Sequence, residues 1–150
     1  MCIRDRADTD SVHDIREIGG DHGHDAAVIL AHAFDLGLVS VPWIQRLPEC
    51  ENWHVFMGFE NGEPAALGSL YMDGDTAWTD FAATDPGFRR RGFQSALLRH
   101  RVRYALDMGC KHIHTCTGEA VPGDPQHSYA NILKVGFREE YLRFNYAPRA

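Results

Sequence analysis

The residues of this chain best suited to chemistry are three consecutive arginines, a glycine and the start of a helix. The arginines precede Gly92, and an amphipathic helical pattern begins directly after that glycine. The first N–H groups of a helix lack partners inside the helix, and phosphate groups bind there, above all beside cations and glycine. The pattern therefore predicts a pyrophosphate site. We name this segment the phosphate loop; it consists of Arg89, Arg90, Arg91, Gly92, Phe93, Gln94 and Ser95.

Two other phosphate-binding motifs are excluded by missing residues. The spacing from Gly87 to Gly92 is that of a nucleoside-triphosphate loop, but phenylalanine and glutamine replace its lysine and hydroxyl residue. The dinucleotide pattern Gly-x-Gly-x-x-Gly is also missing. The remaining alternative is a solvated basic run before a surface helix. The order of strand, proline turn, glycine and helix favours a binding site over that alternative.

The elements that must position this loop follow from hydrophobic periodicity and turn residues. Alternating, β-branched segments predict strands, and apolar residues at helical spacing predict helices. The predicted strands are 12–18, 53–60, 65–72, 76–84, 111–117 and 141–146, and the predicted helices are 26–34, 43–47, 93–108 and 125–135. Their order, β-α-α-β-β-β-α-β-α-β, indicates an α/β fold in which a mixed sheet of about six strands carries helices on both faces. The helical crossover makes the fourth and fifth strands parallel.

Length, composition and charge limit the organisation and the partners. With 150 residues and four cysteines without paired spacing, the chain is expected to be one cytoplasmic domain with reduced thiols. A formal charge of −6 argues against nucleic acid, and no apolar run has the roughly 18 residues that span a membrane. We expect a non-native or disordered segment at 1–11, which fits no element, and a single domain at 12–150.

Basic and histidine residues cluster locally. Six arginines within fifteen residues predict a positive patch that suits a small polyanion: Arg89, Arg90, Arg91, Arg99, Arg101 and Arg103. Two histidine pairs, His22/His24 and His112/His114, have a spacing that can bind zinc. No cysteine or carboxylate stands at matching spacing, so we predict no metal site.

Through the residues of the phosphate loop, the chain resembles the GNAT superfamily of acyl-CoA-dependent N-acyltransferases. The family motif is Gln/Arg-x-x-Gly-x-Gly/Ala; Arg89 and Gly92 match it, and Gln94 replaces the final small residue. The string Arg-Gly-Phe-Gln-Ser-Ala-Leu-Leu is similar to a bacterial branch that carries glutamine there. Residues 131–137, which end in Gly-Phe, also resemble the family's last helix. The resemblance extends over residues 12–146, in a GNAT-like, mostly antiparallel sheet.

The resemblance implies acetyl-CoA as the co-substrate. Its pyrophosphate would bind the phosphate loop, and its pantetheine arm would pair with the end of the fourth strand, where small residues leave room. The implied strand residues are Phe81, Ala82, Ala83 and Thr84. Ser128 and Asn131 would hydrogen-bond the pantetheine or the thiolate, or they are ordinary helix-surface residues. The resemblance further implies direct attack by an amine, with a backbone oxyanion donor near Phe81 to Ala83 and no covalent intermediate.

The sequence offers more than one candidate for the general acid and the general base. Many family members carry a tyrosine acid four residues before the Gly of Gly-Phe, where this chain has Ile132. Tyr129 is the nearest substitute, although an aromatic packing role fits it as well. Glu119 and Asp80 are candidate bases, acting directly or through water, with Glu119 preferred. Each carboxylate fits equally well as a solvated acid at a strand or turn.

The acceptor is expected to be a primary amine on a small molecule or a peptide. Its pocket is predicted between the first two helices and the last strand, and its lining residues are Phe34, Leu38, Trp43, Tyr141 and Tyr146. Little chain remains for the family's seventh strand, so a second copy would cover the sheet edge in a homodimer. The alternative function is a non-catalytic acyl-CoA-binding module, or half of a tandem acetyltransferase.

Overall fold

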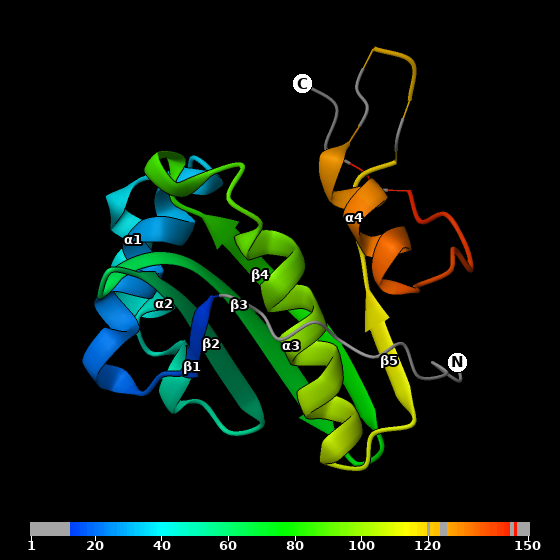
Figure 1. The fold of residues 1–150 in the computed structure, drawn as a ribbon, viewed down its shortest axis with the longest axis horizontal. Coiled ribbons are helices and arrows are strands. Elements are labelled where there is room, and N and C mark those ends of the chain that lie inside the picture. Colours follow the sequence, from blue (N-terminus) through cyan, green and yellow to red (C-terminus); the bar gives the residue numbers. More distant parts are fainter. Residues whose placement is uncertain (1–12, 120, 124–125, 145, 147–150) are drawn as a thin grey trace.

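The computed structural model describes residues 13–119, 121–123, 126–144 and 146 as one sheet with helices on both faces (Figure 1). The sheet contains β1 Asp14–Glu17, β2 Trp53–Glu60, β3 Glu63–Asp73, β4 Thr76–Thr84 and β5 His112–Thr115, in that spatial order. Neighbouring strands are antiparallel except β4 and β5, which are parallel. The predicted α/β fold with a mixed, mostly antiparallel sheet is confirmed.

Local turn chemistry sets the central hairpin. Asn61 and Gly62 have φ angles of 53° and 84°, the pair of positive values that a tight hairpin with right-handed strand twist needs. The bounds of β2 and β4 coincide with the predicted strands at 53–60 and 76–84.

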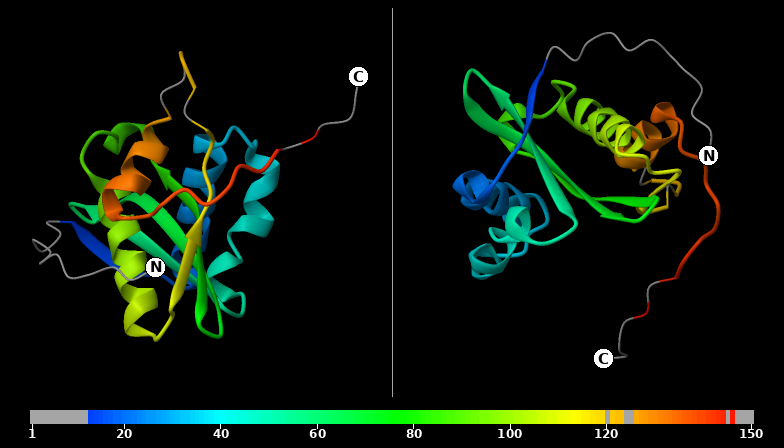
Figure 2. Two further views of the ribbon diagram at one scale, coloured as in Figure 1. Left: turned by 90° about the vertical axis from the view of Figure 1, so that its right-hand side faces the viewer. Right: turned by 90° about the horizontal axis from the view of Figure 1, so that it is seen from below.

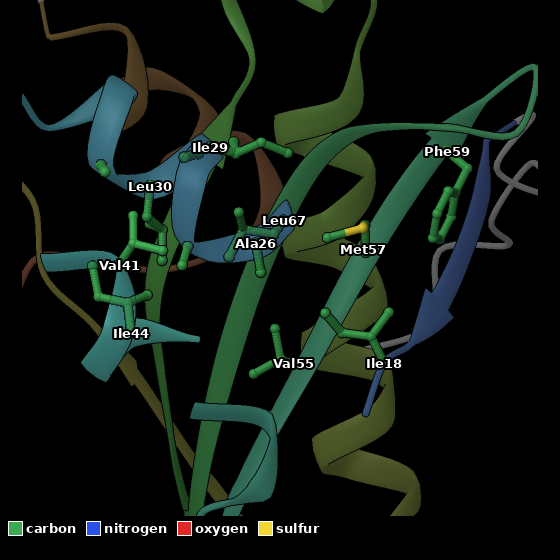
Figure 3. Packing of buried hydrophobic residues seen from close by; sticks show 13 residues of the cluster. Ile18, Ala26, Ile29, Leu30, Val41, Ile44, Val55, Met57, Phe59 and Leu67 are labelled. Carbon is green, nitrogen blue, oxygen red and sulfur yellow. The ribbon is translucent and has the colours of Figure 1, made fainter. Parts of the chain in front are cut away.

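The helices form two layers. Helices α1 Gly23–Ala33 and α2 Val41–Ile44 cover one face, and α3 Phe93–Asp107 and α4 His127–Val135 cover the other (Figure 2). Because alternate residues of β2 point to opposite faces, Val55 and Met57 pack with α1 while Phe56 packs with α3. Figure 3 shows the first of these two cores, in which α1 and α2 lie against β2 and β3. No helix in the described part of the chain is both long and apolar enough to cross a membrane.

The predicted sixth strand at 141–146 is wrong. Gly136 ends α4 with a φ of 111°, and none of residues 137–144 or 146 is in a strand. Tyr141, Phe144 and Tyr146 are 73%, 75% and 91% exposed, and this segment extends away from the sheet (Figure 2). An apolar pattern makes a strand only where a neighbouring strand supplies hydrogen-bond partners and packing. The sheet therefore has five strands in the described residues.

Two predictions fall outside the described residues. They are the non-native or disordered segment at 1–11 and the start of the last helix at Asp124-Pro125. The described part of that helix begins at His127, after Gln126.

Candidate functional site

Strands β4 and β5 separate at the level of the candidate site. They pair from Thr76–His112 to Thr79–Thr115, after which β5 ends and β4 continues to Thr84 (Figure 1). From Asp80 onward, one edge of β4 therefore has no strand beside it among the described residues. An open strand edge can accept an extended, amide-containing ligand as an additional strand.

A β-bulge lies on this open part of β4. Leu67 pairs with Ala83 and Ser69 with Asp80, so Phe81 and Ala82 together stand opposite the single residue Gly68. Phe81 has a left-handed φ of 36°, which is strained for an aromatic residue. Bulges of this kind are frequent next to active sites, where they redirect backbone groups.

Asp80, a predicted base, accepts two hydrogen bonds at this bulge. Its carboxylate Oδ1 accepts a 2.8 Å hydrogen bond from the backbone N–H of Phe81. Its backbone carbonyl accepts a 3.0 Å hydrogen bond from Arg101 Nη1. No contact among the described residues joins Asp80 to Glu119 or Tyr129, so these three candidates do not form one acid–base group.

The phosphate loop presents free backbone amides. It follows the short 3-10 helix Pro86–Phe88, which the Asp85 carboxylate caps by accepting from Gly87 N at 2.8 Å. Arg90 and Gly92 have left-handed φ angles of 62° and 86°, and α3 begins directly after them. None of the amides of residues 89–95 donates a hydrogen bond to another group of the described chain. These donors are available to an anion, and successive N–H groups in such a turn favour anions.

The three loop arginines differ in their surroundings. The guanidinium of Arg91 pairs with Glu60, donates to Gly87 O at 3.0 Å and lies 5.2 Å from the centre of the Phe88 ring. The carbonyl of Arg91 is hydrogen-bonded to His13 Nε2 at 2.7 Å. Arg91 therefore braces the loop, whereas the side chains of Arg89 and Arg90 are exposed. The latter two carry the charge available to a ligand.

Gln94 joins the loop to α4. Its Nε2 donates to Ser128 Oγ, and its Oε1 accepts from Asn131 Nδ2, both at 2.8 Å and both partly buried. The structure thus brings together three residues that the sequence placed in the site separately. We call this group the amide clamp.

Two acidic residues, Glu139 and Glu119, influence the hydroxyl of Tyr129. The hydroxyl of Tyr129 donates a 3.0 Å hydrogen bond to Glu139 Oε2. That hydrogen bond, the charge of Glu139, burial and the charge of Glu119 raise the pKa of Tyr129, in that order of importance. A raised pKa makes Tyr129 a weaker acid, and its proton is already shared with Glu139.

Helices α1 and α2, where the acceptor pocket is predicted, border two hollows. A small hollow of about 10 Å³ lies between Phe81 of the bulge and Trp43, Ile44 and Leu47. Beside it is an open hollow of about 510 Å³ whose lining residues are His24, Val28, His32, Leu38, Val41, Pro42 and Gln45. The predicted residues Phe34, Leu38 and Trp43 are more than half exposed in this region. Tyr141 and Tyr146, which were also predicted, do not line either hollow.

Arg101 is a residue that sequence reasoning misplaced. The local arginine count put it in the surface patch, but it is only 3% exposed. The available signal was its position on α3, because it shares the buried face with Leu97 and Val102. Metal-binding geometry gives no further site: among the residues that the structure describes, no group of three or more His, Cys, Asp or Glu could hold a metal ion.

A model of the acetyltransferase (GNAT) family matches residues 27–137. No curated protein sequence shows significant similarity to the chain.

Several solved structures share the fold. AAC(6')-Iy in complex with the bisubstrate analog CoA-S-monomethyl-acetylneamine aligns with a TM-score of 0.73 at 16% identity, covering 93% of this chain and 100% of that one. The aminoglycoside acetyltransferase HMB0005, from an uncultured soil metagenomic sample, aligns at 0.70 and 20%, covering 93% and 100%. Glucosamine-6-phosphate N-acetyltransferase from Arabidopsis thaliana aligns at 0.69 and 15%, covering 91% and 99%. At these identities the likeness concerns the fold.

Proposed function

Because the chain belongs to the acetyltransferase (GNAT) family, we propose that it transfers an acetyl group from acetyl-CoA to a primary amine of a small molecule or peptide. One observation carries the proposal: the open edge of β4 leads to the unoccupied amides of the phosphate loop. A ligand that combines an extended amide chain with a pyrophosphate matches both features. The structural neighbour AAC(6')-Iy is bound to a CoA-containing analog, which supports this ligand.

The cofactor would bind in two parts. Its pyrophosphate accepts hydrogen bonds from the amides of residues 90–95, beside the exposed cations Arg89 and Arg90. Its pantetheine arm lies along Phe81 to Thr84 on the open edge of β4. The amide clamp borders the loop from α4, so Ser128 and Asn131 contact the arm only where Gln94 leaves them free hydrogen-bonding capacity.

The reaction would be a direct acyl transfer. The neutral amine attacks the thioester carbonyl, a C–N bond forms, the C–S bond breaks, and the thiolate of CoA leaves with the bond electrons. One amine proton passes to a base or to water, and the thiolate takes a proton from an acid or from solvent. The oxyanion needs a backbone donor. The Phe81 amide already bonds to Asp80, so Ala82, the second bulge residue, is the donor that we propose.

Glu119 is the base that we propose. It is exposed and close enough to Tyr129 to affect that hydroxyl, whereas the Asp80 carboxylate is held by the bulge. The amine would enter from the side of α1 and α2, where Trp43 and the open hollow of about 510 Å³ offer apolar contact with a histidine rim. Aminoglycoside and glucosamine-6-phosphate acetyltransferases among the structural neighbours support a small-molecule amine.

A second candidate is an acyl-CoA-binding module without turnover. Ile132 stands at the family's usual tyrosine position, and the hydroxyl of Tyr129 is engaged by Glu139. Both features weaken acid catalysis without touching the cofactor segments.

Ligand-dependent unfolding and turnover test both functions. Acetyl-CoA and CoA, but not ATP, should raise the melting temperature, since a ligand at 100 times its Kd stabilises by about 2.7 kcal/mol. Arg90→Glu should remove most of that shift, and Arg99→Glu, an exposed charge later on α3, should retain it. Release of free CoA thiol against a panel of amines then measures transfer.

The outcomes are distinct. Binding with amine-dependent thiol release supports the transferase, and binding without it supports the module. A melting temperature that CoA leaves unchanged would overturn both.

A further inference from the structure

The most unusual charge in the molecule is the buried guanidinium of Arg101 in the middle of α3. It is 3% exposed, and within the described chain all its hydrogen bonds go to backbone carbonyls. Buried cations are costly and are normally paired with carboxylates or replaced by apolar residues. Arg101 has no such ion pair with the described residues, so its retention calls for a role other than simple stability.

Two of the three carbonyls that Arg101 contacts lie at the edge of the β4 bulge; the third is that of Leu97, one turn earlier in α3. Its Nη1 donates to Ser69 O at 2.8 Å and to Asp80 O at 3.0 Å. Ser69 and Asp80 form the last regular pair of β3 and β4 before the bulge. One nitrogen therefore links both strands at the point where the register shifts.

Gly68 makes room for this link. A Cβ on Gly68 would lie 2.7 Å from both Cζ and Nε of Arg101, closer than real Cβ contacts. Gly68 is also the residue opposite the bulge. The β4 bulge therefore lies where Gly68 of β3 contacts Arg101 of α3.

The bulge needs such support because its backbone is strained. Phe81 has a φ of 36°, and non-glycine residues stay in this region only where the surroundings hold them. Arg101 holds the carbonyl of Asp80, while the Asp80 carboxylate holds the N–H of Phe81 at 2.8 Å. Burial lowers the pKa of Arg101 to about 10, against the opposing charge of Asp80, so the cation is present at neutral pH.

We propose that Arg101 is a positioning residue for acyl transfer: from inside the core it fixes the β4 bulge, so that the backbone N–H groups after Phe81 are aimed at the thioester. Arg101 touches neither the cofactor nor the acceptor in this arrangement. The proposal rests on the proposed function, because acyl transfer is what brings a thioester to the amides of the bulge.

Two variants disturb this contact from opposite sides. Arg101→Lys keeps the charge but lacks the planar fork that reaches several carbonyls. Gly68→Ala keeps the arginine but places a methyl group against its guanidinium. Both should lower kcat by about 100-fold, the cost expected of a misplacement near 1 Å, while the Kd for CoA changes less than about threefold. Arg99→Lys on the exposed side of α3 is the matched control and should be neutral.

Amide hydrogen exchange gives a readout that does not depend on turnover. Both variants should increase exchange at residues 80–83 while leaving the amides of β2 unchanged. If Arg101→Lys fails to fold, Gly68→Ala carries the test. Variants that fold, keep kcat within twofold and retain wild-type exchange in β4 would overturn the proposal. A wild type that binds no CoA would overturn the proposed function, and the exchange data would still decide whether Arg101 holds the bulge.

Discussion

The side-chain carboxylate and the backbone carbonyl of Asp80 both hold the backbone of β4 in place. Its carboxylate accepts from Phe81, and its carbonyl accepts from Arg101. At the scale of single residues, these two hydrogen bonds give Asp80 a structural role in the bulge and leave Glu119 as the base that we propose.

His100 is a single residue that makes the free energy of unfolding depend on pH. Burial, followed by the charge of Arg101, lowers the pKa of His100 below its ordinary value of 6.5; the charge of Glu17 raises it and Arg103 lowers it further. The unfolded chain therefore binds the proton more readily than the folded chain. The contribution of neutral His100 to stability is complete above about pH 6.5 and is lost as the pH falls below that value.

Urea unfolding at pH 7.5 and 5.5 measures this effect. The free energy of unfolding should fall less between these pH values in His100→Gln than in the wild type. His112→Gln, an exposed histidine, should behave as the wild type does. Equal pH dependence in His100→Gln and the wild type would contradict the assignment.

At the scale of elements, the site is made by two strands that part and two helices that are tied together. The β4–β5 pairing ends at Thr79 and Thr115, and the amide clamp holds α4 beside the start of α3. Gln94 stands where the family motif has a small residue, so this clamp depends on a position at which the chain departs from that motif. It couples the position of α4 to that of the phosphate loop.

Removing the clamp should loosen α4. Gln94→Ala deletes two partly buried hydrogen bonds and should lower the free energy of unfolding by about 1–3 kcal/mol. Ser128→Ala deletes one of them and should cost about half as much. Urea unfolding gives the energies, and amide exchange in α4 locates the change. Unchanged exchange in α4 of Gln94→Ala would show that packing, rather than the clamp, holds the helix.

At the scale of the whole molecule, the described residues expose apolar side chains in two places of interest. One is the surface of α1 and α2, and the other is the segment after α4 with Tyr141, Leu142, Phe144 and Tyr146. Strand β5 has a free edge among the described strands. Exposed aromatic segments and free edges favour association between chains.

The homodimer stays a prediction, and solution mass tests it. Light scattering after size-exclusion chromatography should give twice the chain mass of 16.9 kDa for the full chain. Deletion of residues 141–150 should give the monomer with a similar melting temperature, because the described apolar side chains of this segment are exposed and contribute little to the core. A dimer that survives the deletion would place the interface elsewhere.

Features that depend on neighbouring residues could be predicted from the amino-acid sequence. Alternation and turn chemistry fixed β2, β4 and the Asn61-Gly62 hairpin, and the order of strand, turn, glycine and helix located the phosphate loop. These features follow from backbone preferences and local hydrogen bonding, which act over a few residues. The resemblance to the GNAT family followed from the same short motifs.

Contacts between side chains that are far apart in the chain could be seen only in the folded structure. It paired Gln94 with Ser128 and Asn131, and it buried Arg101 against the bulge instead of leaving it in a surface patch. It also left residues 141–144 and 146 outside the sheet. Burial, hydrogen-bond partners and strand pairing depend on elements that pack together although they are distant in the chain. Hydrophobic periodicity reports only on residues close in sequence, so it cannot predict these contacts.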